Sequence, residues 1–231
     1  MWWIDAWHIP TLDEARAIMT SVKGRWRPLI LVAMFCGLRS SELRALTWAN
    51  VDLDNRLVHI RQRADKYGAL GNPKSDDGNR SVPMLPLVAN ALREWKLQCP
   101  RTALDLVFPS RRGGIELHNV MVEWGLWPAQ VTAGVCTIVK DADGKVVVDA
   151  KGEPVRQAKY TGLHALRHFY ASWCINRKVD GGLELPPKDV QYRVGHATIS
   201  MTLDTYGHLF PKADARDEME AAEQQFLRTT K

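Results

Sequence analysis

Residues 194–208 read VGHATISMTLDTYGH and carry Tyr206 ten residues after His196, which follows Gly195 at an expected helix junction. A phenol with a pKa near 10 is about one part in a thousand ionised at pH 7. It therefore needs a proton acceptor and a cationic setting before it can attack another group. Tyr206 is either a packing residue or a nucleophile, and the rest of the chain must supply the partners that a nucleophile requires.

The stretch CGLRSSEL at 36–43 places Arg39 between a chain-turning glycine and an expected helix capped by Ser40 or Ser41. Backbone N–H groups at such a helix start, together with the forked donors of a guanidinium group, can form a phosphate-binding site. Taken alone, Arg39 fits an ordinary surface arginine better than a phosphate-binding residue. Glu42 is expected to orient a helix or a neighbouring side chain, with a plain surface carboxylate as the alternative.

The stretch HALRH at 164–168 holds His164 and Arg167 three residues apart, which puts both side chains on one face of a helix. A histidine and a cation held together can handle a proton and a negative charge at one site. His168 is expected to point elsewhere and to be structural. The histidines without a catalytic signal are His8, His59, His118 and His208.

Composition allows one sizeable core, or a main domain with a small appendage, because the chain has 231 residues and is 45% hydrophobic. The net charge of +5 suits a polyanionic partner, although many metabolic enzymes share it. The four cysteines form no CxxC pair and no zinc-ligand spacing, which is typical of reduced thiols. The sequence contains neither the carboxylate cluster of a metal nuclease nor a Walker-type loop.

The N-terminal segment lacks the basic region of a signal peptide, and the longest apolar run, at 29–36, is too short to span a bilayer. We therefore expect a soluble, cytoplasmic protein.

The pattern predicts a mostly α-helical fold with a small antiparallel β-sheet (α+β), an extra hairpin and no internal repeat. A capping box, TLDE at 11–14, starts the first helix, and a second helix runs from Pro28 to a break at Gly37. The other expected helices lie at 87–97, 163–177, 186–194, 198–209 and in the tail. The expected strands lie at 56–62, at 80–84, and in a hairpin at 135–150 around Asp143-Gly144. A short strand followed by a loop is expected within 105–114.

GLRSSEL, HALRHFYAS and VGHATISMTLDTYGHLF, in this order, resemble the three signature boxes of the tyrosine recombinase (phage integrase) family. Lys74, in NPKSDDGNRSVPM, resembles the lysine on the β-hairpin of that family, including the basic residue and the Val-Pro that follow it. The resemblance covers roughly residues 11–211. Each box alone is ambiguous, whereas four in the right order and spacing leave little room for coincidence.

The resemblance implies an enzyme that cuts and rejoins DNA strands through a 3′-phosphotyrosyl intermediate formed by Tyr206, with no metal and no cofactor. Arg39 and Arg167 would clamp the phosphate oxygens, and Lys74 would protonate the leaving 5′-oxygen. His164 would take the proton of Tyr206 or support the transition state, and His196 would hydrogen-bond a phosphate oxygen. The assignment between the two histidines stays open.

The expected domains are a linker remnant at 1–10, a catalytic domain at 11–211 and a tail helix at 212–231, with an inserted hairpin at about 129–160 in the catalytic domain. The family commonly has a core-binding domain before the catalytic one, so we expect a fragment cut at a linker. Such a fragment should bind DNA weakly and with strong salt dependence. The tail carries an apolar stripe at Ala215, Met219, Ala222 and Phe226 that suits docking on another protomer or on its own domain.

Double-stranded DNA and a homo-oligomer, a tetramer assembled on DNA from free monomers, are the implied partners, with no membrane. A role in prophage or genomic-island integration is the leading interpretation. A chromosome-dimer resolvase or a type IB topoisomerase is the enzyme alternative, and a DNA-binding regulator on the same fold is the non-enzyme alternative. The sequence leaves open whether Tyr206 attacks in cis or in trans and whether accessory DNA-bending proteins take part.

Overall fold

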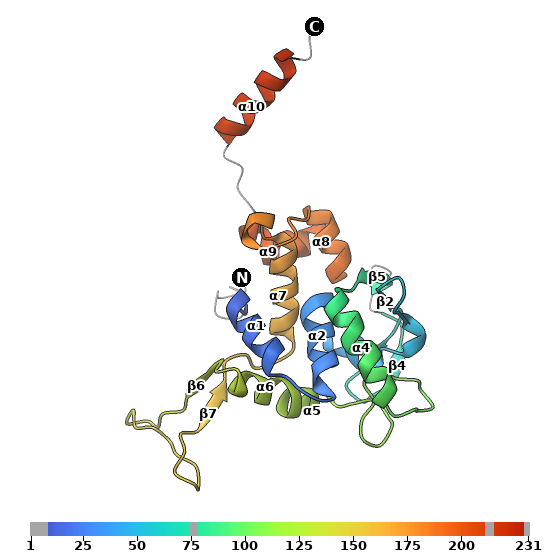
Figure 1. The fold of residues 1–231 in the computed structure, drawn as a ribbon, viewed down its shortest axis with the longest axis vertical. Coiled ribbons are helices and arrows are strands. Elements are labelled where there is room, and N and C mark those ends of the chain that lie inside the picture. The colour runs from blue at the N-terminus through green and yellow to red at the C-terminus, as the bar shows by residue number, and fades with distance from the viewer. Residues whose placement is uncertain (1–8, 74–77, 211–214, 229–231) are drawn as a thin grey trace.

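The computed structural model describes residues 9–73, 78–210 and 215–228, and confirms a mostly helical fold with small antiparallel sheets (Figure 1). The helices are α1 (Leu12–Ser21), α2 (Trp26–Cys36), α3 (Ser40–Ala45), α4 (Pro86–Gln98), α5 (His118–Met121), α6 (Trp127–Thr132), α7 (His164–Ile175), α8 (Pro187–Val194), α9 (Ile199–Tyr206) and α10 (Ala215–Arg228). The strands are β1 (Val51–Asp52), β2 (Leu57–Ile60), β3 (Arg63–Ala64), β4 (Leu70–Gly71), β5 (Arg80–Pro83), β6 (Cys136–Ile138) and β7 (Arg156–Ala158).

Helix α2 forms the centre of the core. Its sequence, WRPLILVAMFC, is apolar on nearly every side, which is the pattern of a fully buried helix. It packs against α7 and α4 (Figure 1). It begins two residues before the expected start at Pro28 and ends, as predicted, at Gly37, whose φ of 62° is the left-handed conformation that closes helices. The chain therefore leaves α2 at Gly37 and reaches Arg39, the N-cap of α3, two residues later.

The starts of two helices show where local sequence rules hold and where they fail. Helix α1 begins with the predicted capping box at 11–14. Helix α3 begins at Ser40 with Arg39 as its N-cap, so the expectation that Ser40 or Ser41 caps it is wrong. The Ser40 hydroxyl is instead hydrogen-bonded to Nδ1 of His118, 2.7 Å away on α5. A distant partner has thus replaced the local cap.

The predicted strands at 56–62 and 80–84 are confirmed as β2 and β5, which pair antiparallel in a sheet of order β1-β2-β5. The expected strand near 105–114 is wrong. That segment makes only isolated bridges, which join Thr47 to Leu106 and Pro109 to Ile115. Its apolar residues are buried, but Pro109 has no N–H to donate to a ladder, so pairing stops after one bridge.

The insertion at 129–160 is more elaborate than the expected hairpin around Asp143-Gly144. Strand β6 pairs with β7, and two tight turns lie between them, at 141–145 and 149–153. In each turn an aspartate Oδ1, of Asp141 or of Asp149, accepts two backbone N–H groups. The turns belong to an eight-residue repeat with the pattern V-x-D-A-x-G, so the expectation of no internal repeat is also wrong.

Helix α10 confirms a helical tail (Figure 1). The Met219 and Phe226 side chains of its apolar stripe are 73% and 77% exposed. No helix within the described ranges is long and apolar enough to cross a lipid bilayer.

Candidate active site

Three arginines from different elements converge on the C-terminal end of α8. The carbonyls of residues 193–195 each accept a hydrogen bond from one of them. Arg80 Nε donates to the first at 2.9 Å, Arg167 Nη2 donates to the second, and Arg39 Nη2 donates to the third at 2.6 Å. The last carbonyls of a helix lack partners within the helix and carry partial negative charge, which suits cations. The end of α8 therefore organises the cluster.

Gly195 makes this arrangement possible. It terminates α8 with φ 66°, a left-handed conformation that favours glycine. A Cβ at this position would lie 2.7 Å from Nη1 of Arg80, closer than real side chains approach. The glycine before His196 is therefore needed for both the turn and the space that Arg80 occupies.

Glu42 is the carboxylate at the centre of the cluster. Its two oxygens accept from Arg80 Nη1 and Nη2 at 3.0 and 2.9 Å, and also from Nη1 and the backbone N–H of Arg39 at 2.9 and 2.8 Å. Burial favours a higher pKa for this carboxyl, but the charges of Arg80 and Arg39 outweigh it and lower the pKa to about 2. Glu42 is only 4% exposed, so the alternative of a surface carboxylate is wrong.

Arg167 and Arg39 differ in exposure although they share the end of α8. Arg167 is 2% exposed and donates through Nη1 to the Gly37 carbonyl at 2.6 Å. Burial, and then the neighbouring charge of Arg39, lowers the pKa of Arg167 to about 9. The Arg39 side chain is 36% exposed and opens onto a cavity of about 340 Å³ that Glu42 and Gly195 also line. Arg39 is thus the accessible guanidinium of the pair.

Tyr206 is buried beside the arginines, with 1% of its surface exposed. Its hydroxyl lies 2.8 Å from Nδ1 of His168, so the expectation that His168 points elsewhere is wrong. The His164 and His168 rings meet edge to face at 4.5 Å, and the His196 ring is stacked parallel to Tyr206 at 6.2 Å. Nδ1 of His196 is 3.0 Å from the buried hydroxyl of Thr202. Two imidazoles, of His168 and His196, therefore lie beside the phenol, and the His164 ring packs against His168.

The resting site is protonated at the phenol and neutral at two imidazoles. Burial raises the pKa of Tyr206 to about 12, although Arg167 and Arg39 pull it down. Burial and the same two guanidiniums lower the pKa of His196 to about 4 and also lower the pKa of His164. The cluster thus concentrates its positive charge on guanidiniums, and His164 and His196 are neutral near pH 7.

The structure thus brings together Arg39, Glu42, His164, Arg167, His196 and Tyr206. Lys74, the one remaining predicted catalytic residue, lies outside the residues that the structure describes. Arg80 was missed as a site residue, since one arginine at a strand start looks like a surface residue, and its signal was only its place before Val-Pro. No group of three His, Cys, Asp or Glu side chains able to hold a metal ion occurs in the described part of the chain.

This fold and cluster define a tyrosine recombinase catalytic domain, and a model of the phage integrase family matches residues 10–213. The chain belongs to that family. It is 26% identical to a XerC-like tyrosine recombinase of Caldanaerobacter subterraneus, over 87% of this chain and 50% of that protein. It is 28% identical to the prophage integrase IntR of Escherichia coli, over 84% of this chain and 46% of that protein. The chain spans about half the length of the curated relatives it matches.

Solved structures share the fold. The Tn1549 transposon integrase in complex with circular intermediate DNA superposes with a TM-score of 0.64 and 21% identity, over 93% of this chain and 66% of that one. The XerA recombinase superposes with a TM-score of 0.61 and 18% identity, over 96% and 65% of the two chains.

Proposed function

We propose that this chain is the catalytic part of a site-specific recombinase that cleaves and rejoins DNA strands through Tyr206. The supporting observation is the convergence of Tyr206, Arg39 and Arg167 around the end of α8, from segments far apart in the sequence. Two guanidiniums beside one phenol suit the transfer of a phosphodiester to tyrosine. The biological role that we infer is integration and excision of a prophage or another mobile element.

In the cleavage step, the Tyr206 oxygen attacks the scissile phosphorus and forms a 3′-phosphotyrosyl bond, while the bond to the 5′-oxygen breaks. The phenol proton passes to His168, whose Nδ1 is 2.8 Å from the hydroxyl. Lys74 protonates the departing 5′-oxygen. The reverse attack by a 5′-hydroxyl of another strand restores a phosphodiester and releases Tyr206, so the ester conserves the bond energy.

Charge on the phosphate oxygens rises in the transition state, and the guanidiniums counter it. Arg39 is partly exposed at the cavity and would meet a phosphate first. Glu42 fixes its direction by accepting from both its side chain and its backbone. In the tautomer whose Nδ1 accepts from the Thr202 hydroxyl, Nε2 of His196 carries the hydrogen that would be donated to a phosphate oxygen. Removing one preorganised hydrogen-bond donor of this kind typically slows the reaction by a factor of about 10²–10³.

Burial of the nucleophile has a kinetic consequence. Tyr206 and Arg167 are 1% and 2% exposed, so the site must rearrange before a scissile phosphate can reach them. A pKa of about 12 also leaves roughly one phenol in 10⁵ ionised at pH 7. DNA entry therefore precedes attack, and attack requires a base that takes the phenol proton.

A duplex with a nick beside the cleavage site tests the proposal, because loss of the short fragment traps the covalent complex. The wild-type chain should form a protein–DNA adduct that survives denaturing electrophoresis, and Tyr206→Phe should not. Tyr67→Phe is the matched control, since that ring is 83% exposed. An adduct of equal yield in Tyr206→Phe would remove Tyr206 as the nucleophile.

Assembly of four copies on DNA is part of the proposal. The exposed Met219 and Phe226 of α10 would dock on a neighbouring copy and link the active sites, while the free chain is a monomer. Truncation after residue 210 should abolish higher-order complexes in gel-shift and light-scattering measurements. Unchanged oligomers would show that α10 does not hold them together.

A further inference from the structure

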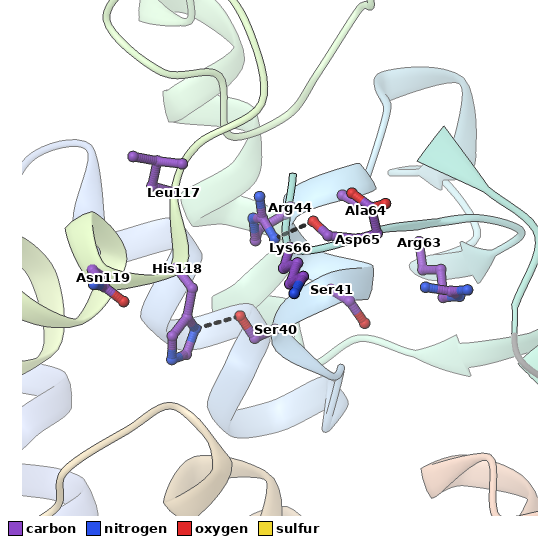
Figure 2. Close-up of a pocket in the computed structure, with 10 residues that line it drawn as sticks. All are labelled: Ser40, Ser41, Arg44, Arg63, Ala64, Asp65, Lys66, Leu117, His118 and Asn119. Carbon is purple, nitrogen blue, oxygen red and sulfur yellow. Dashed lines mark hydrogen bonds between the residues drawn. The ribbon is translucent and has the colours of Figure 1, made fainter. Parts of the chain in front are cut away.

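A second polar cavity, the α3 pocket, lies beside the candidate active site and has a volume of about 650 Å³ (Figure 2). It is formed where the start of α3, strand β3 and the start of α5 meet. Its polar lining includes Ser40, Ser41, Arg63, Lys66, His118 and Asn119.

The lining of the α3 pocket favours an anion. Arg44, Arg63 and Lys66 contribute three cations against the carboxylate of Asp65. That carboxylate is occupied in its own turn, where Oδ1 accepts from the backbone N–H groups of Tyr67 and Ala69 at 2.8 Å each. Arg44 forms the floor, held by backbone carbonyls of Glu116 and Asp65. The excess positive charge of the α3 pocket is therefore available to an anionic ligand.

Arg63 supplies an independent sign of a missing partner. Its buried Nε has no hydrogen-bond partner within the residues that the structure describes. Leaving a buried donor unsatisfied is costly, and such groups are rare in native proteins. An anion bound at the partly exposed guanidinium would satisfy this donor once the Arg63 side chain turns toward it.

The α3 pocket adjoins the cavity at Arg39. Ser41 and Arg63 line both cavities, and Ser40 directly follows Arg39 in the chain. A DNA strand whose scissile phosphate lies at Arg39 would pass along Arg63 toward Ser40. The Ser40–His118 hydrogen bond of 2.7 Å fixes the serine hydroxyl at the far side of this path.

We propose that the α3 pocket binds a backbone phosphate of the cleaved DNA strand, next to the scissile one, with Arg63, Lys66 and Ser40 as its donors. His118 is a positioning residue in the tautomer whose Nδ1–H donates to Ser40 Oγ, because the serine hydrogen is then left for the phosphate. This inference rests on the proposed strand-transfer function and extends it, because it adds a second anchor that fixes the register of the strand. The contact is to phosphate, so it adds affinity without base preference.

Salt-dependent DNA binding measures this anchor. Each phosphate contact contributes about 0.9 to the slope of log affinity against log salt. Arg63→Gln should lower the slope of the wild-type chain by about 0.9 and weaken binding roughly eightfold at 0.1 M salt. Arg156→Gln is the charge-matched control, because Arg156 is exposed on β7 and lines a different cavity. Thermal melts of both variants verify that they fold.

Chemically neutralised DNA locates the phosphate. A methylphosphonate placed one position from the scissile phosphate should weaken binding by the wild-type chain. The same change should cost less in Arg63→Gln than in the wild-type chain, because one of the donors to that phosphate is already lost. Additive losses at all positions within three nucleotides of the cleavage site, or a salt slope in Arg63→Gln equal to that of Arg156→Gln, would overturn the proposal.

Inorganic phosphate distinguishes a DNA anchor from a pocket for a free anion. NMR signals of His118 that shift with duplex DNA, and with phosphate only at far higher concentration, support the DNA anchor. Shifts with phosphate that DNA does not displace would refute it. Failure of the wild-type chain to form a covalent adduct while Arg63→Gln still lowers the slope would reject strand transfer and retain the anchor.

Discussion

Replacing Glu42 with glutamine removes the negative charge that Arg80 and Arg39 share, while the size and shape of the side chain are kept. Three guanidiniums would then meet at the end of α8 without the buried carboxylate that joins two of them. We expect this substitution to destabilise the fold and to disorder Arg39.

The magnitude follows from the carboxyl group itself. Its pKa is lowered from 4.5 to about 2, and each pKa unit corresponds to about 1.4 kcal/mol, so the folded state favours the charged form by about 3 kcal/mol. Glu42 is 4% exposed, so solvent screens this interaction little. Removing one partner of a buried ion pair typically costs about 3–5 kcal/mol, which agrees. We therefore expect Glu42→Gln to lose about 3 kcal/mol of unfolding free energy.

Urea denaturation followed by tryptophan fluorescence measures the loss at pH 7, with Glu94→Gln, an exposed residue of α4, as the matched control. A pH series gives a second readout. Between pH 4.5 and about 2 the unfolded state binds a proton that folded Glu42 refuses, so the wild type loses stability as the pH falls through this window. Glu42→Gln should lack this part of the acid dependence.

Two results would refute the reasoning. A loss below 1 kcal/mol in Glu42→Gln would mean that the ion pairs contribute little beyond the cost of burying them. An acid profile identical to that of the wild type would mean that other carboxyls carry the pH dependence.

Three further substitutions test other parts of the site. Gly195→Ala should cost more stability than Gly144→Ala, because both glycines have positive φ but only the Cβ at Gly195 would meet Arg80; denaturation midpoints compare them, and equal losses would exclude the steric clash. His196→Asn should flatten the stability profile between pH 6.5 and about 4, because the wild-type imidazole resists the proton that the unfolded chain takes up, so that stability is lost as the pH falls through this window. An unchanged slope in His196→Asn would place that titration elsewhere. Arg39→Lys should slow single-turnover cleavage by about 10²–10³ while DNA affinity falls less than tenfold, because lysine cannot match the guanidinium fork. Equal losses in rate and affinity would make Arg39 a binding residue only.

Local signals in the sequence predicted much of the scaffold. The capping box at 11–14, the helix ends at Gly37 and Gly195, and the strands that became β2 and β5 depend on backbone conformation and short-range periodicity. These properties belong to the residues in place, so they can be predicted without knowing what packs against them. The same rules failed at Ser40, where a histidine from α5 takes the hydroxyl that would have capped the helix.

The sequence alone determined which side chains able to bind or attack a phosphate are present and in what order. It also determined that α2 and α8 end at Gly37 and Gly195, close to these side chains in the chain. Only the tertiary structure decided that Glu42 is a buried anion, that Arg80 belongs to the cluster, and that His168 rather than His164 contacts Tyr206. The physical reason is that three arginines acquire their direction from the free carbonyls at the end of α8. Those carbonyls become a common acceptor only after α2, β5, α7 and α8 have packed together.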